Sequence, residues 1–345
     1  MSLRFGIIGA GNIAPVHATA ITSIAGAELV AVADNNLERC QALVGKFGGT
    51  PYNDYHDLLG RSDVDVVTIC LPPYLHAPVT LAAAAAGKHV LCEKPMAISL
   101  AECDAMIAAC EKAGVTLGVI FQGRFEPLAL RLKAAIDSGE LGQLLWVSAN
   151  TFWHRTDAYY RSGEWRGKLA TEGGGVLINQ AIHAIDLLLW LAGKPVRVTA
   201  QIRTLNHQIE IEDCAFASME YENGKLGLIQ ATTISIPGYP ERLEFYGTLG
   251  SAIYHKGQGR LEWHFLDADK DHIETSEASN GATRPMDILP TAHISQFKDF
   301  VKAINENRPP AISGQEGRHS IELVNAIYRS SQLNSSIALP LSAED

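Results

Sequence analysis

The stretch FGIIGAGNIA, residues 5–14, is predicted to pass from an apolar strand through a tight turn into the start of a helix. Gly9, Gly11 and Ala14 match the pattern G-x-G-x-x-[GA]. Glycines in such a turn let the backbone bend and approach a pyrophosphate, whose charge is stabilised by the amides and dipole of the helix N-terminus. We therefore expect a dinucleotide cofactor here, in contact with Asn12 and Ile13 as well as the glycines.

The rest of the first 120 residues continues this alternation of strand and helix. Strands are predicted at residues 4–8, 28–33, 64–71, 88–92 and 116–121, and helices at residues 13–24, 37–47, 77–86 and 100–113. Gly26, Gly87 and Gly114 follow three of the helices as expected C-terminal stops. The alternation predicts an α/β protein whose residues 1–122 form a Rossmann domain with a doubly wound parallel sheet.

Beyond Arg124 the pattern changes to longer alternating strands. They are predicted at residues 144–153, 196–203, 214–222, 225–235, 242–246 and 260–266, with helices at 293–305 and 316–334. Asn223 and Gly224 separate two strands and predict a tight hairpin with positive φ at both residues. Residues 123–345 are thus expected to form an α+β domain with a large, mostly antiparallel open sheet, and the stretch from Asp267 to Pro290 to be a mobile loop.

Composition and charge exclude several classes of protein. The 345 residues are 47% hydrophobic and 19% charged, which allows a full core and argues against disorder. Against 38 acidic residues stand 28 Lys and Arg, for a net charge of −10, so nucleic-acid binding is not expected. No apolar run reaches the roughly 18 to 20 residues of a membrane span, and we expect a cytoplasmic protein. The six cysteines show no C-x-x-C pair and predict neither disulfides nor a metal site.

Asp34 ends the second predicted strand, at the spacing expected of the carboxylate that accepts the adenosine ribose hydroxyls. A carboxylate there would repel a ribose phosphate, so NAD is favoured over NADP. Arg39 lies nearby and leaves some tolerance of NADP open. The alternative is that Asp34 is an ordinary turn former, helped by Asn35 and Asn36.

The carboxyl ends of two further predicted strands carry LPPYLH, residues 71–76, and CEKP, residues 92–95. Open α/β sheets bind ligands at these ends, so the cofactor-binding candidates extend to Leu71, Pro72, His76, Glu93 and Lys94. Lys94 follows an apolar strand and precedes a proline, where its ammonium could polarise a hydroxyl or carbonyl oxygen. The alternative is a solvated lysine in a surface turn.

The stretch EGGGVLINQAIHAIDLLLW, residues 172–190, reads as a buried helix. Asn179, His183 and Asp186 fall at i, i+4 and i+7 and would share one face of it. Buried polar groups need partners or a purpose, and a polar stripe after three glycines indicates a cavity wall. Satisfied core residues are the alternative, and a metal site is not expected because no third ligand is evident.

Together these segments resemble the Gfo/Idh/MocA family, named after glucose-fructose oxidoreductase, inositol dehydrogenase and MocA. The resemblance covers nearly the whole chain and rests on Gly9 to Gly11, on residues 86–95, and on Gly173 to Gly175 followed by Asn179 and His183. It implies an oxidoreductase in which the second domain binds substrate and pairs with a second subunit. The family's substrates are mostly sugars, polyols and their acids.

The resemblance also implies roles for single residues. Lys94 would lie beside the nicotinamide, and His183 would be the general base that takes a hydroxyl proton as hydride leaves the same carbon. Gln122 and Arg124 match the segment that usually touches nicotinamide or substrate. Many members have Asp where this chain has Asn179, and an amide can orient a substrate or imidazole but cannot share a proton. The Asn-Gln pair before His183 is similar to branches that act on amino sugars or nucleotide-sugar uronates.

The segment from Trp153 to Lys168 concentrates four fixed cations and four aromatic residues in an acidic chain. Arginine forks bind carboxylates or phosphates and aromatic faces suit sugar rings, so an anionic sugar is a sensible ligand. The substrate-binding candidates here are Tyr160, Arg161, Trp165 and Arg166, which join Arg124, Asn179 and His183. A solvated loop with internal ion pairs is the alternative.

The favoured function is therefore an NAD-dependent dehydrogenase of a sugar, polyol or sugar acid, with Lys94, His183 and Asn179 as the catalytic set. Two alternatives stay open: a redox-neutral glycosidase that oxidises its substrate transiently on bound NAD, and a non-catalytic sensor of dinucleotide or sugar. The expected partners are a small carbohydrate and a second copy of the chain, as a homodimer or homotetramer.

Overall fold

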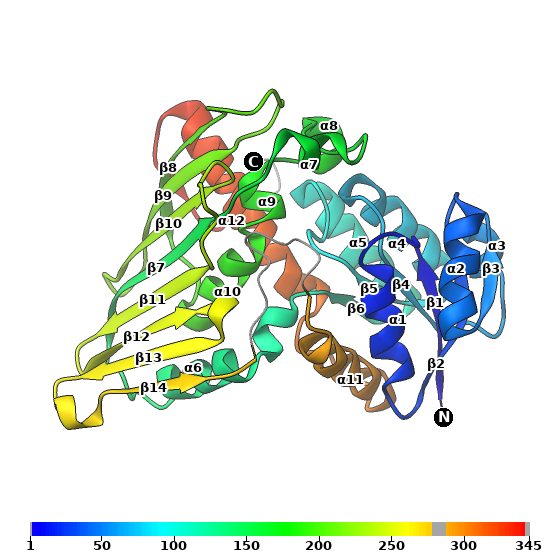
Figure 1. The fold of residues 1–345 in the computed structure, drawn as a ribbon, viewed down its shortest axis with the longest axis horizontal. Helices are drawn as coiled ribbons and strands as arrows, with labels where there is room; N and C mark the ends of the chain where they lie inside the picture. The colour runs from blue at the N-terminus through cyan, green and yellow to red at the C-terminus, as the bar shows by residue number, and fades with distance from the viewer. Residues whose placement is uncertain (1, 278–287, 342–345) are drawn as a thin grey trace. The chain divides into compact units, whose positions relative to one another are not determined.

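The first 120 residues form the predicted parallel sheet in the computed structural model, which describes residues 2–277 and 288–341. The six strands lie in the order β3-β2-β1-β4-β5-β6, and all neighbours run parallel. This is the Rossmann order, with the reversal between β1 and β4. The strands are β1 (Leu3–Ile8), β2 (Ala27–Ala33), β3 (Thr50–Tyr52), β4 (Val66–Ile69), β5 (His89–Cys92) and β6 (Leu117–Val119) (Figure 1).

Helices connect these strands. They are α1 (Ala14–Thr22), α2 (Leu37–Phe47), α3 (Tyr55–Leu59), α4 (His76–Ala85) and α5 (Leu100–Ala113), with a 3₁₀ turn at Pro73–Leu75. Side chains at Asn36, Asp54 and Ser99 cap α2, α3 and α5. The predicted α2 and α5 have the observed bounds. The short β3 and α3 were not predicted, because segments of three and five residues carry too little periodicity.

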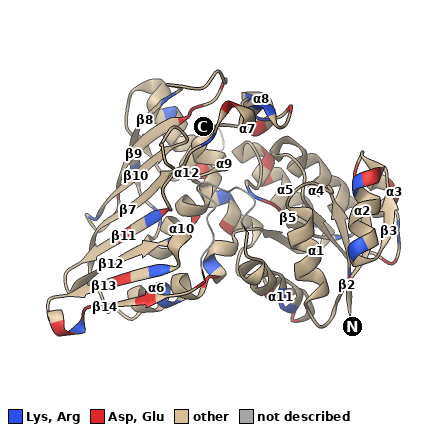
Figure 2. Ribbon diagram, viewed as in Figure 1, with Lys and Arg blue, Asp and Glu red and all other residues tan. Residues whose placement is uncertain are grey.

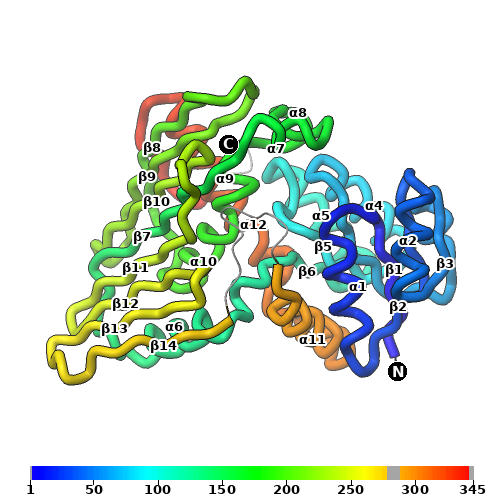
Figure 3. The backbone as a smooth tube through the Cα atoms, in the orientation of Figure 1, coloured from blue at the N-terminus to red at the C-terminus, as the bar shows by residue number. Residues whose placement is uncertain are grey.

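Contacts divide the chain into two units: Met1–Gln122 with Leu289–Arg318, and Gly123–Ile288 with His319–Asp345. The expected boundary after residue 122 is present, but residues 289–318 belong with the first unit rather than the second. The reason is helix α11 (Thr291–Asn305), whose Phe297, Phe300 and Val301 pack into the core around β1. Figure 3 shows α11 beside α1, although the two helices are far apart in sequence.

The second unit is built on nine strands in the order β14-β13-β12-β11-β7-β10-β9-β8-β15. The described pairs are antiparallel except β7 with β10. The strands are β7 (Leu144–Phe152), β8 (Arg197–Arg203), β9 (Cys214–Glu220), β10 (Leu226–Thr232), β11 (Arg242–Gly247), β12 (Gly250–His255), β13 (Arg260–Phe265), β14 (His272–Thr275) and β15 (Ile337–Ala338). Charged residues of both signs occur on the second sheet (Figure 2). Arg242 and Glu244, both on β11, form an ion pair.

Helices accompany this sheet, and α10 packs against β7. They are α6 (Pro127–Asp137), α7 (Asp157–Arg161), α8 (Leu169–Glu172), α9 (Val176–Asn179), α10 (Ile182–Ala192) and α12 (Gly314–Leu333), which begins in the first unit, and 3₁₀ turns lie at Gln122–Phe125, Lys256–Gln258 and Ala268–Lys270. No single helix among the described residues has the length and hydropathy to cross a membrane; the bent pair Leu169–Asn179 and Ile182–Ala192 meets that test by length and composition only.

Two local expectations for the second unit differ from the structure. The hairpin between β9 and β10 forms, but positive φ occurs only at Gly224 and not at Asn223. The amide of Gly224 donates to Tyr221 O, so a type I turn precedes a glycine bulge. The stretch expected to be a loop contains β14, which pairs with β13. The same stretch contains the 3₁₀ turn at Ala268–Lys270, and its residues 278–287 lie outside the described residues.

All six cysteines are free thiols. Five of them are buried, and Cys214 on β9 is half-buried. Burial raises the pKa of all six thiols. They are small apolar core residues, as the sequence indicates.

Candidate active site

The turn between β1 and α1 has the geometry that a pyrophosphate requires. Gly9 has φ +97°, and a Cβ there would lie 2.5 Å from the carbonyl oxygen of Cys70, so only glycine fits. A Cβ at Gly11 would have nothing within 4 Å, so its backbone faces open space. Asn12 is exposed and Ile13 is the N-cap of α1. The turn therefore fits the dinucleotide predicted from the sequence.

Asp34 directly follows β2 and is half-buried. Its Oδ2 accepts the amide of Ala10 at 2.7 Å, and its Oδ1 accepts the amide of Asn36 at 2.8 Å. The carboxylate thus fixes the glycine turn as well as its own turn. Each carboxylate oxygen has a further lone pair, so the predicted ribose contact and the turn-forming role are compatible.

His76 connects the two other predicted cofactor segments. Its Nδ1 lies 2.7 Å from Pro95 O and its Nε2 lies 2.8 Å from Leu71 O, in a buried position. Burial lowers the pKa of His76, and because a carbonyl oxygen only accepts, a neutral ring donates to one of the two carbonyls and only contacts the other. His76 therefore packs between the end of β4 and the end of β5, a structural contact that adds to the predicted cofactor role. The Gln122 amide oxygen, also predicted to face the cofactor, is buried with no hydrogen-bond partner among the described residues.

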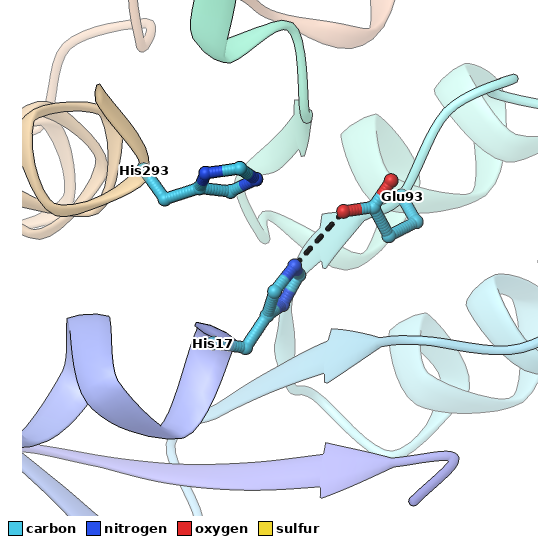
Figure 4. A group of neighbouring side chains, drawn as sticks. All are labelled: His17, Glu93 and His293. Carbon is cyan, nitrogen blue, oxygen red and sulfur yellow. Dashed lines mark hydrogen bonds and ion pairs between the residues drawn. The ribbon is translucent and has the colours of Figure 1, made fainter. Parts of the chain in front are cut away.

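A buried group of three possible metal ligands lies in the first unit: His17 on α1, Glu93 after β5 and His293 on α11 (Figure 4). Their ligand atoms all lie within 4.8 Å of one another. No metal was expected from the sequence, and His17 and His293 were not singled out because their residues are distant in sequence. The Nε2 of His17 lies 2.9 Å from Glu93 Oε1, so these two side chains satisfy each other directly.

In the second unit, the predicted continuous helix after the triple glycine is broken. Helix α9 ends at Asn179 and α10 begins at Ile182, so the expected single face through Asn179, His183 and Asp186 is wrong. Asn179 instead donates its side-chain amide to Glu172 Oε1, and Glu172 Oε2 accepts the amide of Gly167 at 2.6 Å. Glu172 is 1% exposed. An ionised carboxylate only accepts hydrogen bonds, so it fixes which end of the Asn179 amide faces it.

Asp186 has a different partner. It forms a buried two-pronged ion pair with Arg124, with Nε to Oδ2 at 2.9 Å and Nη2 to Oδ1 at 2.7 Å. The Arg124 guanidinium also lies over the ring of Trp190. The guanidinium of Arg124, which was predicted to bind substrate, thus binds the Asp186 carboxylate within the second unit. This pair explains the polar residue at position 186 of an otherwise apolar helix.

Glu212, which no sequence pattern indicated, supports the start of α9 from inside. Its carboxylate accepts the amides of Gly175 at 2.7 Å and Leu177 at 2.9 Å and the hydroxyl of Tyr328 at 3.0 Å. Burial outweighs these three donors and raises the pKa of Glu212 to about 7. The residue therefore holds the segment that leads to Asn179 and His183, and His183 itself lies half-buried near the start of α10.

The predicted substrate residues in the segment from Trp153 to Lys168 lie in different environments. Tyr160 is buried and its hydroxyl lies 3.0 Å from Thr233 Oγ1, which is an internal contact. The side chain of Arg161 is 75% exposed. Arg166 lies over the rings of Tyr159 and Trp165, at 4.2 Å from each centroid. The neighbouring Tyr159, not predicted, accepts hydrogen bonds from Arg166 at 2.6 Å and from Gln180 at 3.1 Å.

Comparison with known proteins gives two family matches. Residues 3–121 match the oxidoreductase family with the NAD-binding Rossmann fold, and residues 129–253 match the GFO/IDH/MocA C-terminal domain. Myo-inositol 2-dehydrogenase of Thermotoga maritima is 27% identical, over 98% of each chain. Inositol 2-dehydrogenase of Klebsiella pneumoniae is 33% identical, over 73% of this chain and 74% of the relative.

Solved structures are similar over almost the whole chain. The WlbA dehydrogenase from Bordetella pertussis, in complex with NADH and UDP-GlcNAcA, is 32% identical with a TM-score of 0.86. The similarity covers 99% of this chain and 100% of that one. A levoglucosan dehydrogenase in complex with NADH and levoglucosan is 25% identical with a TM-score of 0.89, over 99% and 100% of the two chains.

Proposed function

The chain belongs to the Gfo/Idh/MocA family of NAD-dependent oxidoreductases, and from this premise we propose that it oxidises a secondary hydroxyl of a sugar that carries a carboxylate. The observation that carries the substrate proposal is Arg166, whose guanidinium lies over Tyr159 and Trp165 beside Gln180. A stacked arginine offers its edge to a carboxylate while the aromatic rings offer faces to a sugar. The similarity to a dehydrogenase solved with UDP-GlcNAcA agrees with this choice.

The reaction divides between the cofactor and the residues of this chain. Bound NAD supplies the acceptor for the hydride that leaves the hydroxyl carbon. His183 takes the hydroxyl proton as general base, and the Lys94 ammonium stabilises the negative charge that grows on the oxygen. The product is a ketone, and reduction uses the same groups in opposite roles.

Asn179 is proposed to orient rather than to transfer a proton. Its amide nitrogen donates to Glu172, so its carbonyl oxygen is turned away from that carboxylate. A hydrogen bond from the substrate hydroxyl or from the His183 ring would use this oxygen. An amide in this position holds its partner without competing for the proton that His183 removes.

The test is a substrate panel of matched pairs, in which NADH formation is followed by absorbance. Nucleotide-sugar uronates and free uronates are compared with their uncharged sugars, and neutral polyols such as myo-inositol are included. We expect turnover with the acidic member of a pair. Turnover only with polyols would contradict the anionic substrate class. Glycoside cleavage without net NADH formation would show the redox-neutral alternative instead.

Substitution of Asp34 is expected to narrow the preference for NAD over NADP. Asp34→Ala removes the carboxylate proposed to accept the ribose hydroxyls, and charged hydrogen bonds of this kind contribute about 1.5–3 kcal/mol, or about ten- to hundredfold. The ratio of kcat/KM for the two cofactors measures the effect. Asp54→Ala is the matched control, because Asp54 caps α3 through the amide of His56. An unchanged ratio in Asp34→Ala would exclude the ribose contact.

Replacement of Asn179 by aspartate is expected to make stability depend on pH. Asn179→Asp places a second carboxyl against the buried Glu172, so one of the two must keep a proton and its pKa is raised. Such a group stabilises the fold below the ordinary carboxyl pKa and loses that contribution as pH rises. The free energy of unfolding relative to wild type should fall by about 1–3 kcal/mol between acidic and neutral pH. Asn36→Asp, at the exposed N-cap of α2, should show no such trend.

A further inference from the structure

The peptide that carries Lys94 is held from inside the first unit by a buried carboxylate. Glu93 is 6% exposed, and its Oε2 accepts the backbone amide of Lys94 at 3.0 Å. Its Oε1 lies 2.9 Å from Nε2 of His17, which is fully buried on α1. The carboxylate therefore uses one oxygen for the neighbouring peptide and the other for a helix distant in sequence.

His17 is itself held on its second nitrogen. Its Nδ1 lies 2.8 Å from Thr68 Oγ1 on β4, and the ring packs edge-on against Phe297 of α11. His293 of α11 completes the group around Glu93, and Figure 4 shows both imidazole rings directed toward the carboxylate. Side chains from α1, β4 and α11 thus form one buried group with Glu93, in which Thr68 of β4 contacts Glu93 only through His17.

The charge on Glu93 is consistent with this arrangement. Burial by itself would raise the pKa of Glu93, but the hydrogen bond from His17 and the charges of His17, His293 and Lys94 lower it to about 2. Glu93 is therefore an ionised acceptor throughout the neutral range. On the far side of Lys94, the carbonyl of Pro95 lies 2.7 Å from Nδ1 of the buried His76. The Lys94 residue is consequently fixed both before and after its Cα.

We propose that Glu93, held by His17, is a positioning residue for Lys94 that fixes the peptide from which the ammonium reaches the substrate oxygen. The inference rests on the proposed role of Lys94 in the reaction. It explains why a full carboxylate is buried next to the predicted catalytic lysine, directly after the apolar residues 90–92 of β5. Misplacement of a catalytic group by 1 Å can cost about a hundredfold in rate.

The test is a double-mutant cycle of Glu93→Ala and Lys94→Ala, measured as kcat, KM and NAD affinity. We expect Glu93→Ala to lower kcat about a hundredfold in wild type but less than about threefold when Lys94 is already alanine, because the two act through one group. NAD affinity is measured for each variant so that a loss of cofactor binding, for which Glu93 and Lys94 are also candidates, is not counted as a loss of kcat. Glu93→Gln should recover most of the activity, since its amide oxygen still accepts from Lys94 and the His17 ring can exchange tautomers.

Glu102→Gln is the matched control, because Glu102 also accepts a backbone amide, that of Ile98, in the connection after β5. It should leave kcat unchanged. Equal losses from Glu93→Ala in both backgrounds would overturn the positioning role, as would Glu93→Gln being as poor as Glu93→Ala. If Glu93→Ala fails to fold, the cycle is repeated with His17→Gln in its place. A loss of kcat that is equal in wild type and in Lys94→Ala would again overturn the positioning role.

Other outcomes separate this proposal from the wider function. A fully active Lys94→Ala enzyme would overturn both the role of Lys94 and its positioning by Glu93. If Lys94→Ala lowers kcat, and Glu93→Ala lowers kcat by the same factor in wild type and in Lys94→Ala, only the positioning role of Glu93 is overturned. One equivalent of a tightly bound divalent metal per chain, lost in His17→Gln and His293→Gln, would show that the three side chains form a metal site and would overturn the hydrogen-bonded arrangement.

Discussion

His183→Ala should abolish most turnover while NAD binding is kept. A positioned general base contributes about 10²–10⁴-fold to the rate, so we expect kcat to fall by about a thousandfold. His183 lies near the start of α10 in the second unit, whereas the glycine turn and Asp34 lie in the first, so cofactor affinity should be nearly unchanged. Steady-state kinetics and titration of NAD by protein fluorescence measure the two quantities separately.

The control for this substitution is His264→Ala. His264 lies on β13, and its side chain is 50% exposed, so its loss should alter neither activity nor NAD affinity. A joint collapse of cofactor affinity and thermal stability in His183→Ala would instead show that the imidazole is a core residue. Partial recovery of the His183→Ala enzyme by added imidazole would strengthen the assignment as base.

Gly175→Ala should lower the free energy of unfolding more than any other glycine-to-alanine substitution near the site. Gly175 precedes α9, and a Cβ there would overlap the carbonyl oxygen of Glu212 and lie within 2.9 Å of its amide nitrogen. These are backbone atoms that cannot rotate away, and the side chain of Glu212 binds the amide of Gly175 itself. We expect the free energy of unfolding to fall by about 3 kcal/mol or more, with loss of activity in the folded fraction.

Urea unfolding of Gly175→Ala beside Gly45→Ala checks this expectation. Gly45 is exposed within α2, and a Cβ there would have nothing within 4 Å, so alanine should stabilise the protein by about 0.5–1 kcal/mol. The two substitutions add the same methyl group with opposite expected signs. A near-neutral Gly175→Ala would mean that the segment between α8 and α9 can shift to make room.

The sequence predicts the fold well where periodicity is long and punctuated by glycine. The helices α2 and α5 and the strands of the first sheet other than β3 follow from the alternation of apolar runs and helical segments, and β9 and β10 from the Asn-Gly turn. Residues 289–318 could not be placed, because an amphipathic helix such as α11 presents the same pattern whichever sheet it covers. The break between α9 and α10 was missed for a related reason: Gln180 and Ala181 are ordinary helix formers.

The candidate site was predictable only in part. Motifs that are contiguous in sequence, such as the glycine turn and the Glu93-Lys94-Pro95 segment, were found with their expected placement at strand ends. Partners that come from distant elements were not found, among them Glu212 with Gly175 and His17 with Glu93. A hydrogen bond between residues far apart in the chain leaves no spacing to recognise, and only the folded structure reveals it.

The burial of the cysteines has a practical consequence for the chemistry of this protein outside its own reaction. Alkylating and oxidising reagents attack the thiolate, and five thiols are withheld from them by both packing and raised pKa values. Cys214, half-buried on β9, is the most accessible of the six. The folded protein should therefore react with a thiol label almost as a single-cysteine protein. Uptake of more than one label per chain then measures the fraction of molecules that have unfolded.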